Sequence, residues 1–205
     1  MKPDPQTPGT GVSGVILAAG QSSRMGRNKL LLPVGGISIL EHCVRGLGAV
    51  CSQTVIVLGA RAGLFDDFRR CHPEIEFVLN QNLADGMLSS IRAGLRAVRE
   101  PRVLILPGDC PFVSEAAYGA VLASGYARAV PVFCGLPGHP VLLDREAIDA
   151  LNSGDGSVSL RDFLSSHGAQ TVFVEDSSIL VDIDDEVAYR EACEAYDQHH
   201  HRAGE

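Results

Sequence analysis

The sequence predicts one α/β domain in which a mainly parallel, mixed sheet is covered by helices on both faces. Short apolar runs alternate with helix-like stretches along the chain, which is typical of parallel strands joined by helical crossovers. A length of 205 residues suffices for one such domain with a sizeable core and is short for two. Polar residues follow several apolar runs, and sheets of this kind bind ligands at the carboxyl ends of their strands.

The elements are expected in the following order. Residues 12–18 form the first strand, and a long loop follows it as far as Lys29. Ser38 and Glu41 have the spacing of a capping box, which predicts a helix that begins at Ser38. Residues 87–99 are the clearest helix, because their apolar residues recur on one face. Further strands are expected at residues 54–58, 75–79, 103–106, 129–132, 141–143, 171–174 and 179–183. Further helices are expected at residues 62–70, 145–151, 160–166 and 186–196, and one from Ser114.

Composition limits the possible environments and partners. A formal net charge of −8 argues against a broad surface for nucleic acid or membrane lipid. No apolar run approaches the roughly 18 to 20 residues of a membrane helix. The six cysteines are scattered without a C-x-x-C pair, which favours reduced thiols in the cytoplasm. We assign residues 12–196 to the domain and expect residues 1–11 and 197–205 to be disordered tails.

The segment from Leu17 to Lys29 carries the strongest functional signal. Small residues and glycine after a strand let the backbone approach a ligand and direct N–H groups at phosphate oxygens. Arg24 can hold a phosphate through its planar guanidinium, and Lys29 supplies a mobile positive charge. The loop has neither Walker A spacing nor a G-x-G-x-x-G fingerprint. The residue types alone also fit a flexible loop with solvated basic side chains.

Two groups of carboxylates are candidates for binding a divalent cation. Asp109 follows an apolar strand directly, although an aspartate before Pro111 also fits an ordinary turn. Asp182 and Asp184 share one face if the strand predicted at 179–183 continues that far. Asp184 or Asp185 also fits the N-cap of the last helix. Mg²⁺ commonly takes one or two carboxylates together with substrate phosphates, which favours a joint metal site.

Four motifs in this order resemble those of the MobA-like nucleotidyltransferases that act on the molybdenum cofactor. The motifs are Leu17–Lys29, Gly86–Ser90, Gly138–Pro140 and Val181–Asp184, and the resemblance extends over most of residues 13–189. The cytidylyltransferase branch is the most similar, because the guanylyltransferase branch typically has glycine where this chain has Ala19. The sequence departs from the family at Cys110, where Gln or Met is usual, and at Asp185-Glu186, where Thr-Pro is common.

The resemblance implies a Rossmann-like fold of the nucleotide-diphospho-sugar transferase type and a role for each matched residue. It implies nucleotide binding by Leu17, Ala18, Ala19, Gly20, Arg24, Lys29, Asn80, Gly86 and Ser90. It implies binding of Mg²⁺, or alternatively Mn²⁺, by Asp109 with Asp182 or Asp184. It implies catalysis by Arg24, Lys29 and Asp109, and contact with the acceptor by His139.

The activity implied in this way is transfer of CMP from CTP to the terminal phosphate of the molybdenum cofactor. A molybdoenzyme or its maturation chaperone is the implied protein partner. Two alternatives stay open. One is a guanylyl- or other nucleotidyltransferase with a different phosphorylated acceptor, and the other is a noncatalytic carrier of the cofactor.

Overall fold

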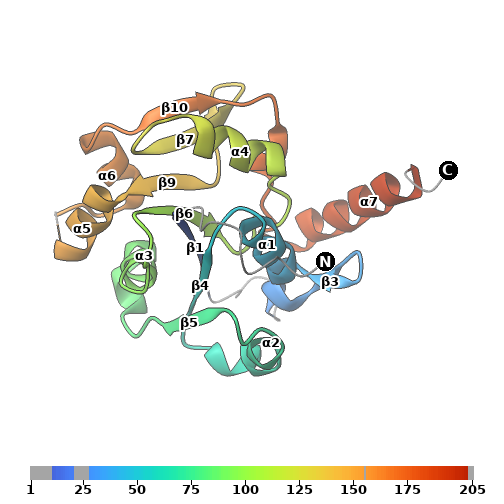
Figure 1. Ribbon diagram of the computed structural model, residues 1–205. Helices are drawn as coiled ribbons and strands as arrows, with labels where there is room; N and C mark the ends of the chain where they lie inside the picture. Colours follow the sequence, from blue (N-terminus) through green and yellow to red (C-terminus); the bar gives the residue numbers. More distant parts are fainter. Residues whose placement is uncertain (1–10, 21–27, 155, 203–205) are drawn as a thin grey trace.

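A computed structural model describes residues 11–20, 28–154 and 156–202, and within them an eight-stranded mixed sheet runs through the molecule (Figure 1). The strand order is β10-β7-β9-β6-β1-β4-β5, and β8 pairs with β7 beside this path. The strands are β1 Val12–Ala18, β4 Gln53–Leu58, β5 Glu76–Leu79, β6 Arg102–Pro107, β7 Ala129–Phe133, β8 Leu136–Pro137, β9 Val141–Asp144 and β10 Gln170–Phe173. The predicted α/β class with a mainly parallel mixed sheet is confirmed.

The register of the central strands brings their carboxyl ends to one edge of the sheet. β1 is parallel to β4 and β6, and β4 is parallel to β5. Ala18 lies beside Leu58, which in turn lies beside Leu79, and Leu17 lies beside Pro107. Strand β9 is antiparallel to both β6 and β7. The loops after β1, β5 and β6 therefore gather at the same edge.

Alternate residues of the central strands are buried against different helices. Ile16, Ile56 and Leu104 belong to a cluster with α1 and α4, whereas Val15 and Val57 belong to a second cluster with α3, α5 and α6. These helices flank the sheet on opposite sides in Figure 1. The helices are α1 Ile39–Gly48, α2 Asp66–Cys71, α3 Met87–Leu95, α4 Glu115–Ala123, α5 Arg145–Ser153, α6 Leu160–Ser166 and α7 Glu186–Arg202. Burial on both faces explains why the strands appear in the sequence as continuous apolar runs.

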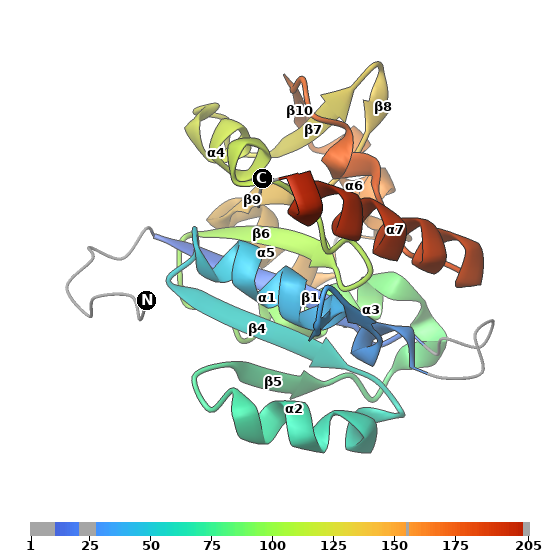
Figure 2. The ribbon, with the colours of Figure 1, turned by 90° about the vertical axis from the view of Figure 1, so that its right-hand side faces the viewer.

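A short hairpin that the sequence did not predict supports the last helix. Strands β2 (Pro33–Val34) and β3 (Ile37–Ser38) form this hairpin, and the hydroxyl of Tyr189 on α7 donates to the carbonyl of Pro33 at 2.7 Å. Helix α7 then extends away from the rest of the molecule and faces the viewer in Figure 2. It continues to Arg202, whereas we expected it to end near residue 196 with a disordered tail. No glycine or proline interrupts residues 197–202, so nothing in them stops the helix.

Ser38 caps α1 as the capping-box spacing predicted. Its hydroxyl accepts a hydrogen bond from the Glu41 N–H at 3.1 Å. The Glu41 carboxylate binds Arg45 and His72.

The strand predicted at residues 179–183 is wrong. Residues Ser177–Leu180 form a 3₁₀ turn, and an extended segment without strand pairing follows. Strand β7 already pairs with β10 on one edge and with β8 and β9 on the other, so it offers no free edge to this segment. Ile179 and Ile183 are nevertheless buried, which explains the strand-like alternation in the sequence.

Helix α3 is shorter than the predicted residues 87–99. The side chain of Gln53 donates to the carbonyl of Ala97 at 2.9 Å and accepts from the N–H of Arg99 at 3.0 Å. This side chain therefore satisfies backbone groups that a longer helix would pair internally.

The cysteines and the helices bear on two expectations from composition. All six cysteines are free, as their scattered spacing predicted. Within the described residues, no helix has both the length and the apolar character needed to cross a membrane.

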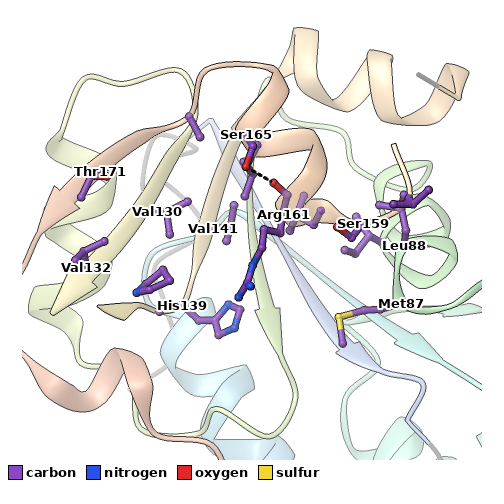
Figure 3. A pocket seen from close by; sticks show the side chains of 17 residues that line it. Met87, Leu88, Val130, Val132, His139, Val141, Ser159, Arg161, Ser165 and Thr171 are labelled. Atoms are coloured by element: carbon purple, nitrogen blue, oxygen red, sulfur yellow. Dashed lines mark hydrogen bonds between the residues drawn. The ribbon is translucent and has the colours of Figure 1, made fainter. Parts of the chain in front are cut away.

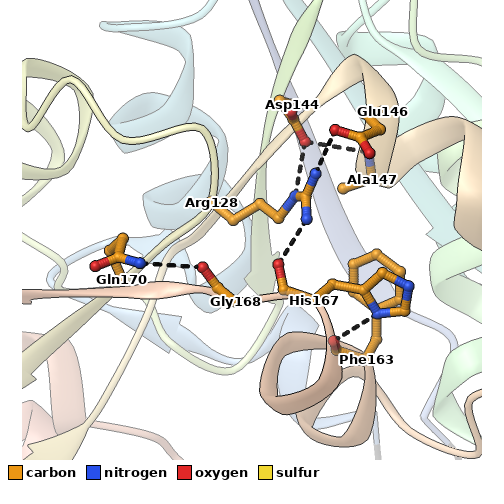
Figure 4. Close-up of polar contacts among 8 residues, drawn as sticks. All are labelled: Arg128, Asp144, Glu146, Ala147, Phe163, His167, Gly168 and Gln170. Atoms are coloured by element: carbon orange, nitrogen blue, oxygen red, sulfur yellow. Dashed lines mark hydrogen bonds and ion pairs between the residues drawn. The ribbon is translucent and has the colours of Figure 1, made fainter.

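Arg128 joins the start of β7 to the helices on one face of the sheet (Figure 4). Its guanidinium donates to Asp144 at 3.0 Å, to Glu146 at 2.8 Å and to the backbone carbonyl of His167 at 2.6 Å. Asp144 also caps α5 by accepting from the N–H of Ala147. Only 13% of the Arg128 side chain is exposed, so water replaces these contacts poorly when the arginine is removed.

We expect Arg128→Met to lower the free energy of unfolding by about 2 kcal/mol, because two carboxylates and a carbonyl lose a charged donor. Urea denaturation measures this change. Arg70→Met is the control, since Arg70 and Asp67 form an ion pair on the exposed surface and contribute less than about 0.5 kcal/mol. Equal effects of the two substitutions would contradict the stabilising role of Arg128.

Candidate active site

The loop after β1 and the loop before α3 enclose a cavity of about 350 Å³ at the carboxyl edge of the sheet. Its lining contains Leu17, Ala19, Gly20, Leu83, Gly86, Met87, Ser90, Pro107 and Asp109. Six of the predicted site residues thus share one cavity. Leu83, Met87 and Pro107 were not predicted. Met87 belongs to the Gly86–Ser90 motif, and Leu83 and Pro107 lie within three residues of Gly86 and Asp109, respectively.

Two predicted nucleotide-binding residues lie behind this cavity. Ala18 is buried within β1, with only 3% of its surface exposed. The buried Asn80 side chain donates to the hydroxyls of Ser89 at 2.8 Å and Ser90 at 2.9 Å. It also accepts from the backbone N–H of Asn82. Asn80 therefore orients Ser90, and its predicted contact with a nucleotide stays a prediction.

Lys29 brings together the two carboxylate groups that the sequence singled out. Its ammonium lies 2.8 Å from Oδ2 of Asp109 and 2.8 Å from Oδ1 of Asp184. Asn28 orients the segment, because its side chain accepts from the N–H of Leu30 at 3.1 Å. Burial lowers the pKa of Lys29, but hydrogen bonds and charge attraction from the two carboxylates outweigh it, so the pKa is raised. The ammonium thus stays charged.

Asp182 adds a third negative charge to the same region. Burial raises its pKa, and repulsion by Asp184 and Asp109 raises it further, while Lys29 acts in the opposite direction. Asp185 takes the role of N-cap, since its carboxylate accepts from two N–H groups at the start of α7 at 2.9 Å each. The cap interpretation therefore applies to Asp185, and Asp184 is directed at Lys29.

Backbone hydrogen bonds join the three segments that carry these side chains. The N–H of Ile183 donates to the carbonyl of Asp109, and the N–H of His139 donates to the carbonyl of Ile179, each at 2.9 Å. Gly138 permits this packing, because a Cβ atom there would come within 2.3 Å of the Ile179 carbonyl oxygen. The thiol of buried Cys43 donates to the carbonyl of Gly108 and supports the turn before Asp109.

His139 lies between this site and a second, larger cavity. It helps to line a cavity of about 580 Å³ between α3, α6 and the strands β7 and β9 (Figure 3). Its Nδ1 atom is buried and has no hydrogen-bond partner among the described residues. Burial lowers the pKa of His139, and the charge of Asp109 opposes that shift. The imidazole is therefore within electrostatic reach of Asp109.

Arg24 lies outside the described residues. The side chains of the C-terminal histidines lie outside them as well.

A lysine and carboxylates beside a glycine-containing loop at a strand edge can bind a polyphosphate together with a divalent cation. The family model for the MobA-like NTP transferase domain matches residues 14–172, and the chain belongs to this family.

Individual relatives carry more specific names. The chain is 28% identical over 171 residues to a molybdenum cofactor cytidylyltransferase from Escherichia coli K12, covering 83% of this chain and 89% of the relative. It is 34% identical over 151 residues to a molybdenum cofactor guanylyltransferase from Xanthomonas euvesicatoria, covering 71% of this chain and 73% of the relative. A Mycobacterium tuberculosis protein solved in complex with manganese has a TM-score of 0.73 at 23% identity, covering 89% of this chain and 98% of that one. The names of the two molybdenum cofactor enzymes thus differ in the nucleotide that is transferred.

We expect Lys29→Met to raise the affinity of the nucleotide-free protein for Mn²⁺ by about tenfold, because the ammonium no longer neutralises Asp109 and Asp184. Isothermal titration with MnCl₂ measures the change. Arg45→Met removes an exposed positive charge from α1, where Arg45 pairs with Glu41, and should leave the affinity unchanged. Unchanged or weaker Mn²⁺ binding by Lys29→Met would show that these carboxylates do not bind the cation.

Proposed function

We propose that this chain transfers CMP from CTP to the terminal phosphate of the molybdenum cofactor and releases pyrophosphate. The observation that carries the proposal is the convergence of Lys29, Asp109 and Asp184 beside the cavity at the end of β1. Family membership supports nucleotidyl transfer. The cytidylyltransferase that matches 83% of the chain supports this donor and acceptor.

The proposed reaction needs alignment and charge neutralisation more than proton transfer. An oxygen of the acceptor phosphate attacks the α-phosphorus of CTP, and the bond from that phosphorus to the β-phosphate oxygen breaks. A phosphate monoester is mostly dianionic at neutral pH, since its second pKa is about 6. It therefore needs no general base. Lys29 neutralises charge on the α-phosphate, and Arg24 binds the β- and γ-phosphates.

The carboxylates fit a divalent cation. Oδ2 of Asp109 and Oδ1 of Asp184 already share one cationic partner in Lys29, and oxygen atoms are the ligands that Mg²⁺ prefers. In the part of the chain that the structure describes, no three His, Cys, Asp or Glu side chains form a metal site by themselves. We therefore propose Mg²⁺, or alternatively Mn²⁺, held by Asp109 and Asp184 or Asp182 and completed by substrate phosphates. Such an ion neutralises charge on the reacting phosphates.

The wall of the first cavity supports a pyrimidine nucleotide. Ala19 lines this cavity, and the guanylyltransferase branch typically has glycine at the matching position. A methyl group at this wall leaves less room for a purine base. Gly20, Gly86 and Ser90 line the same space, and we assign them to the nucleotide.

The proposed setting is the cytoplasm, because six free cysteines fit a reducing compartment. The product would pass to a molybdoenzyme or its maturation chaperone.

We expect the purified protein to release pyrophosphate fastest with CTP when CTP, GTP, ATP and UTP are each mixed with molybdenum cofactor and Mg²⁺. EDTA should abolish the release, and Mg²⁺ or Mn²⁺ should restore it. A preference for GTP would replace the donor in the proposal. Binding of the cofactor without pyrophosphate release from any nucleotide would instead identify a noncatalytic carrier.

We expect Asp109→Asn to lower kcat at least a hundredfold, because the amide lacks the charge that holds a cation at the reacting phosphates. The thermal midpoint should stay within about 3 °C of the parent protein, since Asp109 is partly exposed. Asp149→Asn is the control, because Asp149 is an exposed carboxylate on α5 outside both cavities. A fully active Asp109→Asn variant would rule out this residue as a metal ligand.

A further inference from the structure

The second cavity is lined mainly by apolar side chains. Its walls come from Val130 and Val132 on β7, Val141 on β9, Ile91 on α3 and Leu164 on α6. A volume of about 580 Å³ is in the range of pockets that enclose small organic molecules. The strands supply branched side chains at fixed positions, and the two helices close the space from the side (Figure 3). Such walls suit the face of a ring system.

Two cationic or hydrogen-bonding groups interrupt this apolar lining. Arg161 on α6 reaches into the cavity in the direction of His139 (Figure 3). Among the described residues, no carboxylate forms an ion pair with the Arg161 side chain. His139 contributes a buried Nδ1 atom that lacks a hydrogen-bond partner within the described chain. Arg161 is an exposed arginine without an ion pair among the described residues, and together with His139 it gives this cavity groups that can bind an anionic ligand.

The cavity adjoins the proposed site of nucleotidyl transfer. Met87 lines both cavities. The His139 backbone is hydrogen-bonded to Ile179, and the segment from Ile179 to Ile183 is in turn hydrogen-bonded to Asp109. His139 and Asp109 therefore lie on segments that are joined by backbone hydrogen bonds.

We propose that Arg161, together with His139, binds the phosphate monoester of the acceptor, whose planar heterocycle occupies the apolar cavity. This inference rests on the proposed function for the identity of the reaction, and it adds Arg161 as a positioning residue. Its planar fork can hold two phosphate oxygens while a third remains directed at the nucleotide. A lysine offers a single point charge and orients the phosphate less well.

Direct binding tests the pocket independently of catalysis. The probes are 6-hydroxymethylpterin and its monophosphate, which differ only in the phosphate group, and their intrinsic fluorescence reports binding. We expect the parent protein to bind the phosphorylated probe more tightly. Arg161→Ala should weaken binding of the monophosphate about tenfold and leave the unphosphorylated pterin unchanged. The affinity of Arg161→Lys for the monophosphate should lie between those of the parent protein and of Arg161→Ala. Arg96→Ala is the control, because Arg96 is an exposed arginine at the end of α3 that lines neither cavity.

Steady-state kinetics with CTP and molybdenum cofactor gives the second measurement. Arg161→Ala should raise KM for the cofactor about tenfold with little change in KM for CTP, whereas a general structural defect would affect both. Equal affinity of the parent and Arg161→Ala for the phosphorylated probe, or an unchanged KM for the cofactor, overturns the inference. If transfer to the cofactor is absent but the phosphate-dependent probe binding is lost in Arg161→Ala, the pocket assignment stands and the proposed acceptor fails.

Discussion

The ion pairs of Lys29 hold the candidate active site together. Asp109 and Asp184 lie 80 and 155 positions further along the chain, yet each carboxylate is 2.8 Å from the same ammonium. Without a cation between them, these carboxylates would repel each other and the nearby Asp182. The raised pKa of Asp182 reflects burial and the residual repulsion from Asp184 and Asp109. The charge balance among the carboxylates after β6 and before α7 thus depends on one positive charge.

That dependence is compatible with a site for a metal and a triphosphate. Lys29 contacts one oxygen of Asp109 and one of Asp184, and the divalent cation of the proposed reaction would compete with it for the charge of these carboxylates. In that proposal, the ammonium becomes available for phosphate oxygens when the carboxylates hold the metal. Backbone hydrogen bonds from Ile183 and His139 keep the segments in place during such an exchange, because they do not involve the charged side chains.

Elements that depend on residues close together in the chain lie where the sequence predicts them. The first strand, the capping serine of α1 and the bounds of α6 agree with the sequence, since each follows from nearest-neighbour hydrogen bonding or from the periodicity of apolar residues. The strand expected at residues 179–183 fails because strand β7, beside which this segment lies, is already paired on both of its edges. Asn80 was predicted to contact the nucleotide. Its side chain is instead buried and orients Ser90 by a hydrogen bond to the Ser90 hydroxyl. The sequence did not single out Arg161, because surface arginines on short helices are common. Only the fold shows that Arg161 lines a cavity whose other walls come from distant segments.

The sequence by itself determined the α/β class and most of its strands and helices, and it supplied the candidate phosphate loop and the candidate carboxylates. These features depend on residues close to one another in the chain, where hydrogen bonding and burial follow a regular spacing. The tertiary structure decided that Asp184 contacts Lys29 while Asp185 caps α7, and that His139 and Arg161 share a cavity. Such contacts join segments far apart in the sequence, and their geometry is set by the order and register of the strands between them.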